Sequence, residues 1–339
     1  MELDYYHNLS EKEDFFKCKT INTLDEFDAF ISESNNLSSN QNIIYRGVCA
    51  AKYKLYNSAQ RYWITNDLED FNGESYTYFI YNLIKNAEKY QGGLLETYFK
   101  AFGCTPNDFS ILSFLQHYGA PTPLLDWTKS FDYGLFFAVD KLTDSACNEI
   151  DNYFSFYALD TTRLIERKRV LRDNVSELIP IYEYAFTITE PTPQKDRIIA
   201  DFNHLEYTTY GEGVCYIDGY NTKDPAYRSE KLPNLNVLFY QPNLNVIAQN
   251  GCFIHFNYND IPQKPLEAYF KETQDDESRE LYSPKIICWN IHKHLREKVY
   301  KHLNEQKEPI TRELLYPQEE NIAKAALKEY LKNKPISYI

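Results

Sequence analysis

The 339-residue sequence lacks the features that mark membrane and secreted proteins. No uninterrupted apolar run approaches the ~20 residues that a membrane-spanning helix needs. The opening residues, MELDYYHNLSEKEDFF, are too charged for a signal peptide. The seven cysteines are odd in number and contain no CxxC pair, which argues against a disulfide framework. We therefore expect a soluble cytoplasmic protein with no membrane partner.

The standard catalytic and nucleotide-binding motifs are also missing. The sequence has no GxGxxG after a strand, no GxxxxGK[ST], no HExxH and no GxSxG. His292, His294 and His302 lie in a stretch rich in lysine and arginine, whose positive charge repels a metal ion. We expect no metal site.

What the sequence does have is an acidic balance and many aromatic residues. There are 49 Asp and Glu against 36 Lys and Arg, a formal net charge of -13. Binding to a phosphate backbone depends on Lys and Arg, so duplex DNA is an unlikely partner. The 30 tyrosines suit polar-tipped pockets and stacking surfaces, although a general composition bias explains them as well.

The hydrophobic pattern predicts an α+β protein with a mainly antiparallel sheet and flanking helices, because helical periodicity comes early and strand-like runs come later. The predicted helices include 76–87, 108–118, one through 133–139 that Thr128 or Ser130 caps, 291–305 and 318–332. The predicted strands are 42–46, 153–159, 181–188, 236–240, 246–249, 252–256 and 284–289. The prolines of Ala120–Trp127 predict a rigid connection between two helices.

The domain organisation is expected to be simple. Residues 1–21 form a polar N-terminal extension, and residues 22–339 form one domain with an enlarged, loop-rich region at about 140–235. Pro and Gly are frequent in the interval 190–235, and no composition shift is clean enough to separate two independent domains.

Three segments that lie far apart in the sequence contain residues that are costly to bury or that restrict the backbone, namely 43–47, 116–128 and 246–253. Arg46 closes an apolar strand and must reach water, a carboxylate or a ligand. The second segment places His117 and Asp126 around a stiff turn, and the third breaks two apolar runs with an amide pair and a glycine. We expect the three segments to meet in one polar hollow around the Arg46 guanidinium.

Each segment also has a purely structural interpretation. Arg46 and Asp126 could form an ion pair that pins the turn, or Asp126 could cap the following helix. His117 could be a neutral histidine bonded to a carbonyl at a helix end. Gln249 to Gly251 could be a hairpin turn or a bulge. The residues alone leave these alternatives open.

The same segments resemble a known family. YRG at 45–47, SFLQHYGAPTPLLDWTKS at 113–130, LFFAVD at 135–140, AQNGCF at 248–253 and PITRELLYPQ at 309–318 are similar to the FRG domain family of bacteria and phages, over roughly residues 22–330. The block around HYGAPTPLLDWT is the specific part of this resemblance.

The FRG resemblance in turn suggests similarity to the ADP-ribosyltransferase fold, a split, mainly antiparallel α+β sheet that holds NAD in a cleft. It implies an NAD-using effector in bacterial or phage defence or toxicity, either an ADP-ribosyltransferase or an NAD glycohydrolase. YRG is similar to the first motif of that fold, and DWTKS with LFFA to the second. Gln249 stands where the third motif has its catalytic Glu, a departure that counts against transferase activity.

By this resemblance the expected catalytic residues are Arg46, His117, Asp126 and Gln249. The expected residues that bind the co-substrate NAD are Tyr45, Gly47, Gln116, Tyr118, Trp127 and Thr128. The expected partners are a nucleotide-type small molecule and an unknown macromolecular acceptor. Two other functions stay open: a binding module that holds a nucleotide or other ligand without turnover, and a protein that acts on nucleic acid through Arg46 and stacking tyrosines.

Overall fold

The computed structural model describes residues 2–38, 40, 42–69, 75–101, 108–142, 148–162, 213–218, 244–257, 261–275 and 286–317. The predicted strands at 181–188 and 236–240, the predicted helix at 318–332 and most of the region at 140–235 lie outside these residues. Within the described ranges, no helix combines the length and the apolar character needed to cross a bilayer.

The centre of the fold is a seven-stranded sheet in the order β1-β7-β4-β2-β3-β6-β5. Its strands are β1 (Lys17–Ile21), β2 (Ile43–Val48), β3 (Leu124–Thr128), β4 (Tyr153–Asp160), β5 (Gly213–Asp218), β6 (Gly251–Asn257) and β7 (Ile286–His292). Every neighbouring pair is antiparallel except β1 and β7, which are parallel. The predicted α+β class is confirmed, but the sheet is mixed, because β1, at one edge, runs parallel to its neighbour β7.

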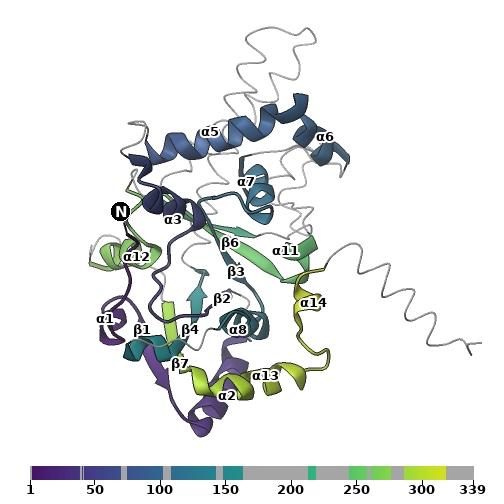
Figure 1. The fold of residues 1–339 in the computed structure, drawn as a ribbon. Helices are drawn as coiled ribbons and strands as arrows, with labels where there is room; N and C mark the ends of the chain where they lie inside the picture. The colour runs from purple at the N-terminus through teal and green to yellow at the C-terminus, as the bar shows by residue number, and fades with distance from the viewer. Residues whose placement is uncertain are drawn as a thin grey trace, which may run out of the picture.

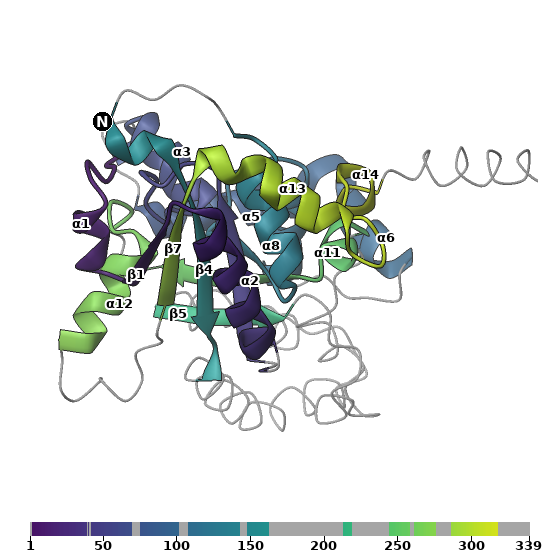
Figure 2. The same ribbon diagram turned by 90° about the horizontal axis from the view of Figure 1, so that it is seen from below.

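Helices cover the sheet in separate groups (Figure 1). The described helices are α1 (Ser10–Glu13), α2 (Leu24–Ser38), α3 (Ser58–Thr65), α5 (Tyr76–Lys89), α6 (Leu94–Ala101), α7 (Asp108–His117), α8 (Phe131–Val139), α11 (Leu244–Ala248), α12 (Leu266–Asp275), α13 (Arg296–Asn304) and α14 (Arg312–Leu315). Helices α3, α5, α6 and α7 share one apolar cluster with β3 and β6. Helices α2, α8 and α13 share another with β2, β4 and β7, and Figure 2 shows these three helices together on that face.

Two predicted elements were wrong in type. The segment predicted as a stiff connection up to Trp127 contains β3, because Pro121 and Pro123 come before the strand and leave its amides free to pair with β6. The segment 246–249, predicted as a strand, lies largely in the short helix α11, where Val246 is buried and Ile247 is exposed. A run of three apolar residues cannot distinguish the two structures by periodicity.

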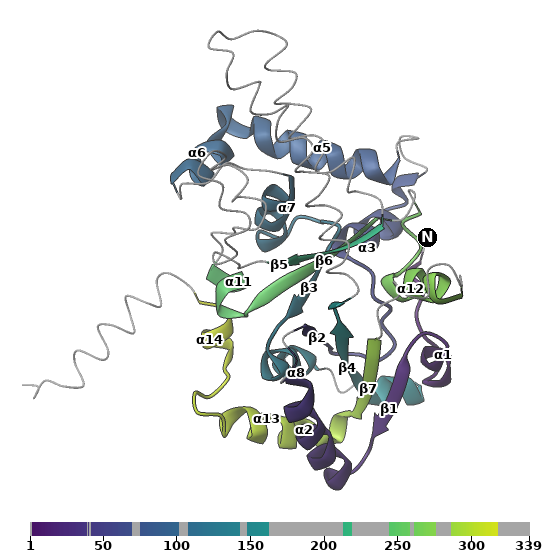
Figure 3. The same ribbon diagram turned by 180° about the vertical axis from the view of Figure 1, so that it is seen from behind.

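The N-terminal segment 1–21, expected as a polar extension, contributes to the sheet and to its core. Residues 17–21 form β1 beside β7, and Figure 3 shows α1 next to these strands. Tyr6, Lys12 and Phe16 are all buried. Three side chains of this mainly polar segment therefore pack into the interior of the protein.

The sheet is narrow at one point in its middle. Strand β2 pairs with β4 over six positions and β3 pairs with β6 over five, but β2 and β3 pair only at Tyr45 and Thr128. The two halves of the sheet therefore part beside this single bridge, and backbone groups of β3 become available to side chains there.

Candidate functional site

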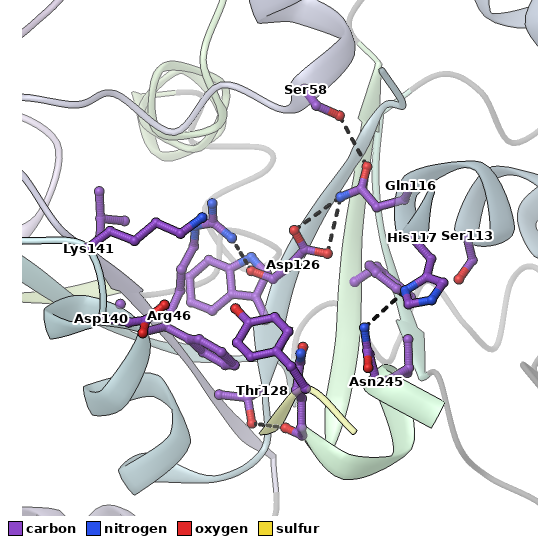
Figure 4. A pocket seen from close by; sticks show the side chains of 18 of the residues that line it. Arg46, Ser58, Ser113, Gln116, His117, Asp126, Thr128, Asp140, Lys141 and Asn245 are labelled. Atoms are coloured by element: carbon purple, nitrogen blue, oxygen red, sulfur yellow. Dashed lines mark hydrogen bonds between the residues drawn. The ribbon is translucent and has the colours of Figure 1, made fainter. Parts of the chain in front are cut away.

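A cavity of about 620 Å³ lies where the two halves of the sheet part (Figure 4). Its walls come from β2, β3, α3, α7, α11 and the segment after α14. The lining includes the predicted residues Tyr45, Arg46, Gly47, Gln116, His117, Asp126, Trp127, Thr128 and Gln249. The three segments singled out in the sequence thus meet in one hollow, as expected.

Arg46 spans the gap between the two halves of the sheet. Its guanidinium Nη1 donates a hydrogen bond to the main-chain carbonyl of Asp126 on β3. Its Nε is buried and has no hydrogen-bond partner among the described residues. Burial lowers the pKa of Arg46 to about 10, although the Asp126 carboxylate opposes that shift. The guanidinium therefore stays charged at neutral pH and keeps a buried N–H without a partner.

Gln116 holds the Asp126 side chain in a fixed orientation. Its Nε2 donates to both carboxylate oxygens of Asp126 at 3.1 Å and to the Leu124 carbonyl at 3.2 Å. Its Oε1 accepts from Ser58 Oγ at 3.1 Å and from Thr122 Oγ1. Asp126 is otherwise exposed toward the cavity. The result is a positioned carboxylate whose amide donor is itself held by two hydroxyls.

His117 follows Gln116 at the end of α7 and contacts α11. Asn245 Nδ2 lies 3.2 Å from His117 Nδ1, so in the neutral ring Nδ1 accepts this hydrogen bond and Nε2 carries the proton. Partial burial lowers the pKa of His117. The ring is therefore neutral at pH 7. Tyr118, expected to bind NAD, lies beside it with 67% of its surface exposed and does not line the cavity.

Trp127, Thr128 and Gln249 form the inner end of the site. Trp127 is almost wholly buried, and its Nε1 has no hydrogen-bond partner within the described ranges. Thr128 Oγ1 donates to the Gln249 carbonyl at 2.7 Å. The Gln249 amide Nε2 donates to the Leu315 carbonyl at 2.9 Å, which ties α11 to α14. The Gln249 amide group is therefore engaged in a hydrogen bond that joins two elements of the fold.

Tyr45 and Gly47 serve the packing of β2. The Tyr45 ring stacks on Phe156 with a centroid distance of 5.7 Å. A Cβ on Gly47 would lie 2.1 Å from the Gly134 carbonyl oxygen and 2.3 Å from the Ala138 amide nitrogen of α8. Gly47 thus allows the backbone of a helix, rather than a ligand, to approach the strand.

Several cavity residues escaped the sequence analysis. Arg61 on α3 lines the cavity, and the pKa values of Arg46 and Arg61 both respond to the Asp126 carboxylate. Lys141 adds a third cation. Asp140 is occupied by Arg312, whose Nη1 lies 2.7 and 2.9 Å from its two oxygens. No motif in the sequence marks these positions.

The charges in the cavity favour an anion. Three cations line it, Asp126 is the only lining carboxylate among the described residues without a salt bridge, and the Arg46 Nε is unpaired. Among the described residues, no group of three or more His, Cys, Asp or Glu is arranged to hold a metal ion. A phosphate or pyrophosphate group is the kind of ligand that a fork-shaped guanidinium binds.

Many of the residues that line this cavity lie in a segment that matches the model of one protein family. Residues 41–147, which are 107 of the 339 residues, match the FRG domain model. This match is shorter than the resemblance over 22–330, and it includes β2, α7 and β3 but not Gln249. Neither the curated proteins nor the solved structures yielded a match.

Proposed function

We propose that the Arg46 cavity binds a nucleotide-type ligand and that this FRG-domain protein is an ADP-ribosyltransferase-like effector that uses NAD. The observation that carries the proposal is that one cavity contains both an incompletely bonded guanidinium and a carboxylate held in a fixed orientation. Arg46 and Arg61 would hold the pyrophosphate, since both guanidinium groups are permanently charged and form paired hydrogen bonds with phosphate oxygens.

Cleavage of NAD at the nicotinamide ribose builds positive charge on the sugar as nicotinamide leaves. A fixed negative charge beside the ribose stabilises that state. Gln249 is neutral and its amide is bound to Leu315, so Asp126 is the group in this cavity that can supply the charge. In this proposal Gln116 acts as a positioning residue that aims the Asp126 carboxylate.

His117 and Trp127 have narrower roles in the proposal. The neutral His117 ring can take a proton at Nδ1 only when the acceptor substrate displaces the Asn245 amide. Trp127 lines the cavity, whereas Tyr118 is largely exposed to solvent. Of these two aromatic residues, both expected to bind NAD, Trp127 is the one that lines the cavity and would contact the nicotinamide in this proposal.

The test separates binding from turnover. Purified protein is titrated calorimetrically with NAD, ADP-ribose, ATP and short single-stranded RNA, and nicotinamide release from labelled NAD is followed in parallel. We expect NAD and ADP-ribose to bind and nicotinamide to be released. Asp126→Asn should keep binding and lose release by about 100-fold or more, as expected when a charge that stabilises the transition state is removed.

A non-catalytic binding module is the second candidate, favoured by the neutral Gln249 and its bond to Leu315. Under this alternative the nucleotide binds, but no nicotinamide release or label transfer is detected with protein or nucleic-acid acceptors. Tight binding of RNA alone would refute both candidates. A role in defence or toxicity is tested by expression in bacteria, where Arg46→Ala should relieve growth inhibition while the variant still accumulates as folded protein.

A further inference from the structure

A fully buried lysine on α1, which is not among the residues that line the Arg46 cavity, faces the sheet. Lys12 has no solvent exposure, and its Nζ lies within 5.6 Å of the ring centres of Tyr6 and Tyr157. The ammonium donates to three uncharged acceptors: the Ala51 carbonyl at 3.0 Å, Ser155 Oγ at 2.6 Å and Asn290 Oδ1 at 2.9 Å. Among the described residues no carboxylate forms a salt bridge with it. A buried cation is costly without an anion nearby, so another acidic group is needed.

The candidate anion is a cysteine thiolate. Cys288 on β7 is fully buried, and in the thiol form its Sγ donates at 3.5 Å to Asn290 Oδ1, the same oxygen that accepts from Lys12. Burial alone would raise the pKa of Cys288, but a hydrogen bond from Cys18 and the charge of Lys12 outweigh it and bring the pKa to about 7. The pKa of Cys18 is raised, because its proton is shared with Cys288.

Cys18 and Cys288 are also placed for a covalent bond. They are register partners on the adjacent parallel strands β1 and β7, so their side chains project from the same face of the sheet. Neighbouring strands lie about 4.8 Å apart, which falls within the range of Cα separations that a disulfide spans. The strand register therefore places the two sulfur-bearing side chains next to each other. Cys18 is half-buried, so one member of the pair can be reached from solvent.

We propose that Cys18 and Cys288 are a redox-active pair that closes a reversible disulfide between β1 and β7, with Lys12 as the cation that activates Cys288. The oxidant is a low-molecular-weight disulfide such as oxidised glutathione. This inference is independent of the proposed function of the Arg46 cavity.

The chemistry takes two exchange steps. Cys18 passes its proton to the Cys288 thiolate and attacks one sulfur of oxidised glutathione. A Cys18–glutathione bond forms, and one glutathione leaves as the thiolate and takes up that proton from Cys288. The Cys288 thiolate then attacks Cys18 Sγ, breaks that bond and expels the second glutathione. The two cysteines lose two electrons and two protons, and the oxidant becomes two glutathione thiols. Cys18 is the accessible attacking residue and Cys288 the buried resolving residue.

The first experiment uses the wild-type full chain. The protein is incubated with oxidised glutathione, digested without reduction, and mapped by mass spectrometry. We expect one dominant cross-linked peptide pair containing Cys18 and Cys288, which dithiothreitol removes, and a melting temperature about 5 °C or more above that of the reduced protein, because the bond closes a long loop. Absence of this peptide pair, or cross-linking mainly through another cysteine, would overturn the proposal.

The second experiment uses variants that separate the two roles. In Cys288→Ala nothing can resolve the first intermediate, so a glutathione adduct on Cys18 should accumulate; in Cys18→Ala neither adduct nor disulfide should form. Cys49→Ala is the matched control, since Cys49 is also free and half-buried, and it should oxidise like wild type. A stable adduct on Cys18 in the wild type, equal to that in Cys288→Ala, would contradict the resolving role.

Discussion

The Arg46 guanidinium donates to the main-chain carbonyl of Asp126 and not to the Asp126 carboxylate. The carboxylate is instead held by the Gln116 amide. This arrangement differs from the side-chain ion pair that the sequence left open as a structural alternative. It leaves a cation and an anion in one cavity that do not neutralise each other through a direct salt bridge, so each can act on a different part of a ligand.

Replacement of Arg46 by lysine tests its role in binding. The ammonium can still reach the Asp126 carbonyl, but it lacks the buried Nε–H and the fork that binds phosphate in a bidentate manner. We expect Arg46→Lys to fold and to bind NAD or ADP-ribose about 10- to 100-fold more weakly in calorimetry. Arg296→Lys, away from the cavity, is the matched control. Equal affinities for both variants would show that Arg46 serves the sheet alone.

Gln116 can be tested by two substitutions of similar size. Gln116→Leu removes the donor to Asp126 and the acceptor for Ser58, and should cost about 1–3 kcal/mol in the free energy of unfolding. Gln116→Glu adds a carboxylate beside that of Asp126, so its cost should be larger at pH 8 than at pH 5, where protonation relieves the repulsion. Urea unfolding at both pH values checks this. A pH-independent cost in Gln116→Glu would contradict the predicted proximity of the two charges.

Gly47 should tolerate no side chain. The Cβ of an alanine would meet the Gly134 carbonyl at 2.1 Å, and backbone atoms of α8 cannot move away cheaply. We expect Gly47→Ala to cost about 3 kcal/mol or more, measured by chemical unfolding or by loss of soluble protein. Gly251→Ala is the control, because its nearest contact is 3.2 Å and its cost should be near 1 kcal/mol. Similar losses in both variants would disagree with the close approach at Gly47.

The buried carboxyl group of Glu267 is expected to make the free energy of unfolding depend on pH. The carboxyl is buried, and it accepts from Tyr6 Oη at 2.6 Å and from the Leu55 amide at 3.1 Å. Burial raises the pKa of Glu267 above its usual value despite these bonds. The folded state therefore binds the proton more tightly than the unfolded chain does. The stability that the protonated Glu267 carboxyl contributes is complete below the usual pKa of a glutamate, and it is lost as pH rises through the raised pKa of the folded state.

Glu267→Gln should consequently gain stability relative to wild type on going from pH 4 to pH 8, because the amide cannot ionise. Unfolding free energies of the two proteins at both pH values give the comparison. Glu272→Gln, whose carboxylate is 53% exposed, should show little of this change. A relative loss of stability in Glu267→Gln at pH 8 would mean that the folded protein prefers the charged carboxylate.

Local sequence patterns predicted the strands β2, β4, β6 and β7, because apolar runs and helix-ending residues are local signals, but they did not predict β1 or β5. Ser130 does cap α8, as one of the two expected residues. The same signals failed at β3 and α11, where short apolar runs next to prolines or a glycine fit more than one structure. Arg61 was missed because an arginine in a short helix looks like a solvated residue until the neighbouring strand is placed.

Sequence alone determined the α+β class, the residue types around Arg46 and the FRG-like block. Only the tertiary structure decided which groups face each other. Cys18, Cys288, Tyr157 and Arg46 lie in one row across β1, β7, β4 and β2, although they come from four distant parts of the chain. Such a row depends on strand register, and a shift of one residue would turn every side chain to the opposite face. Long-range packing sets that register, and no local pattern contains it.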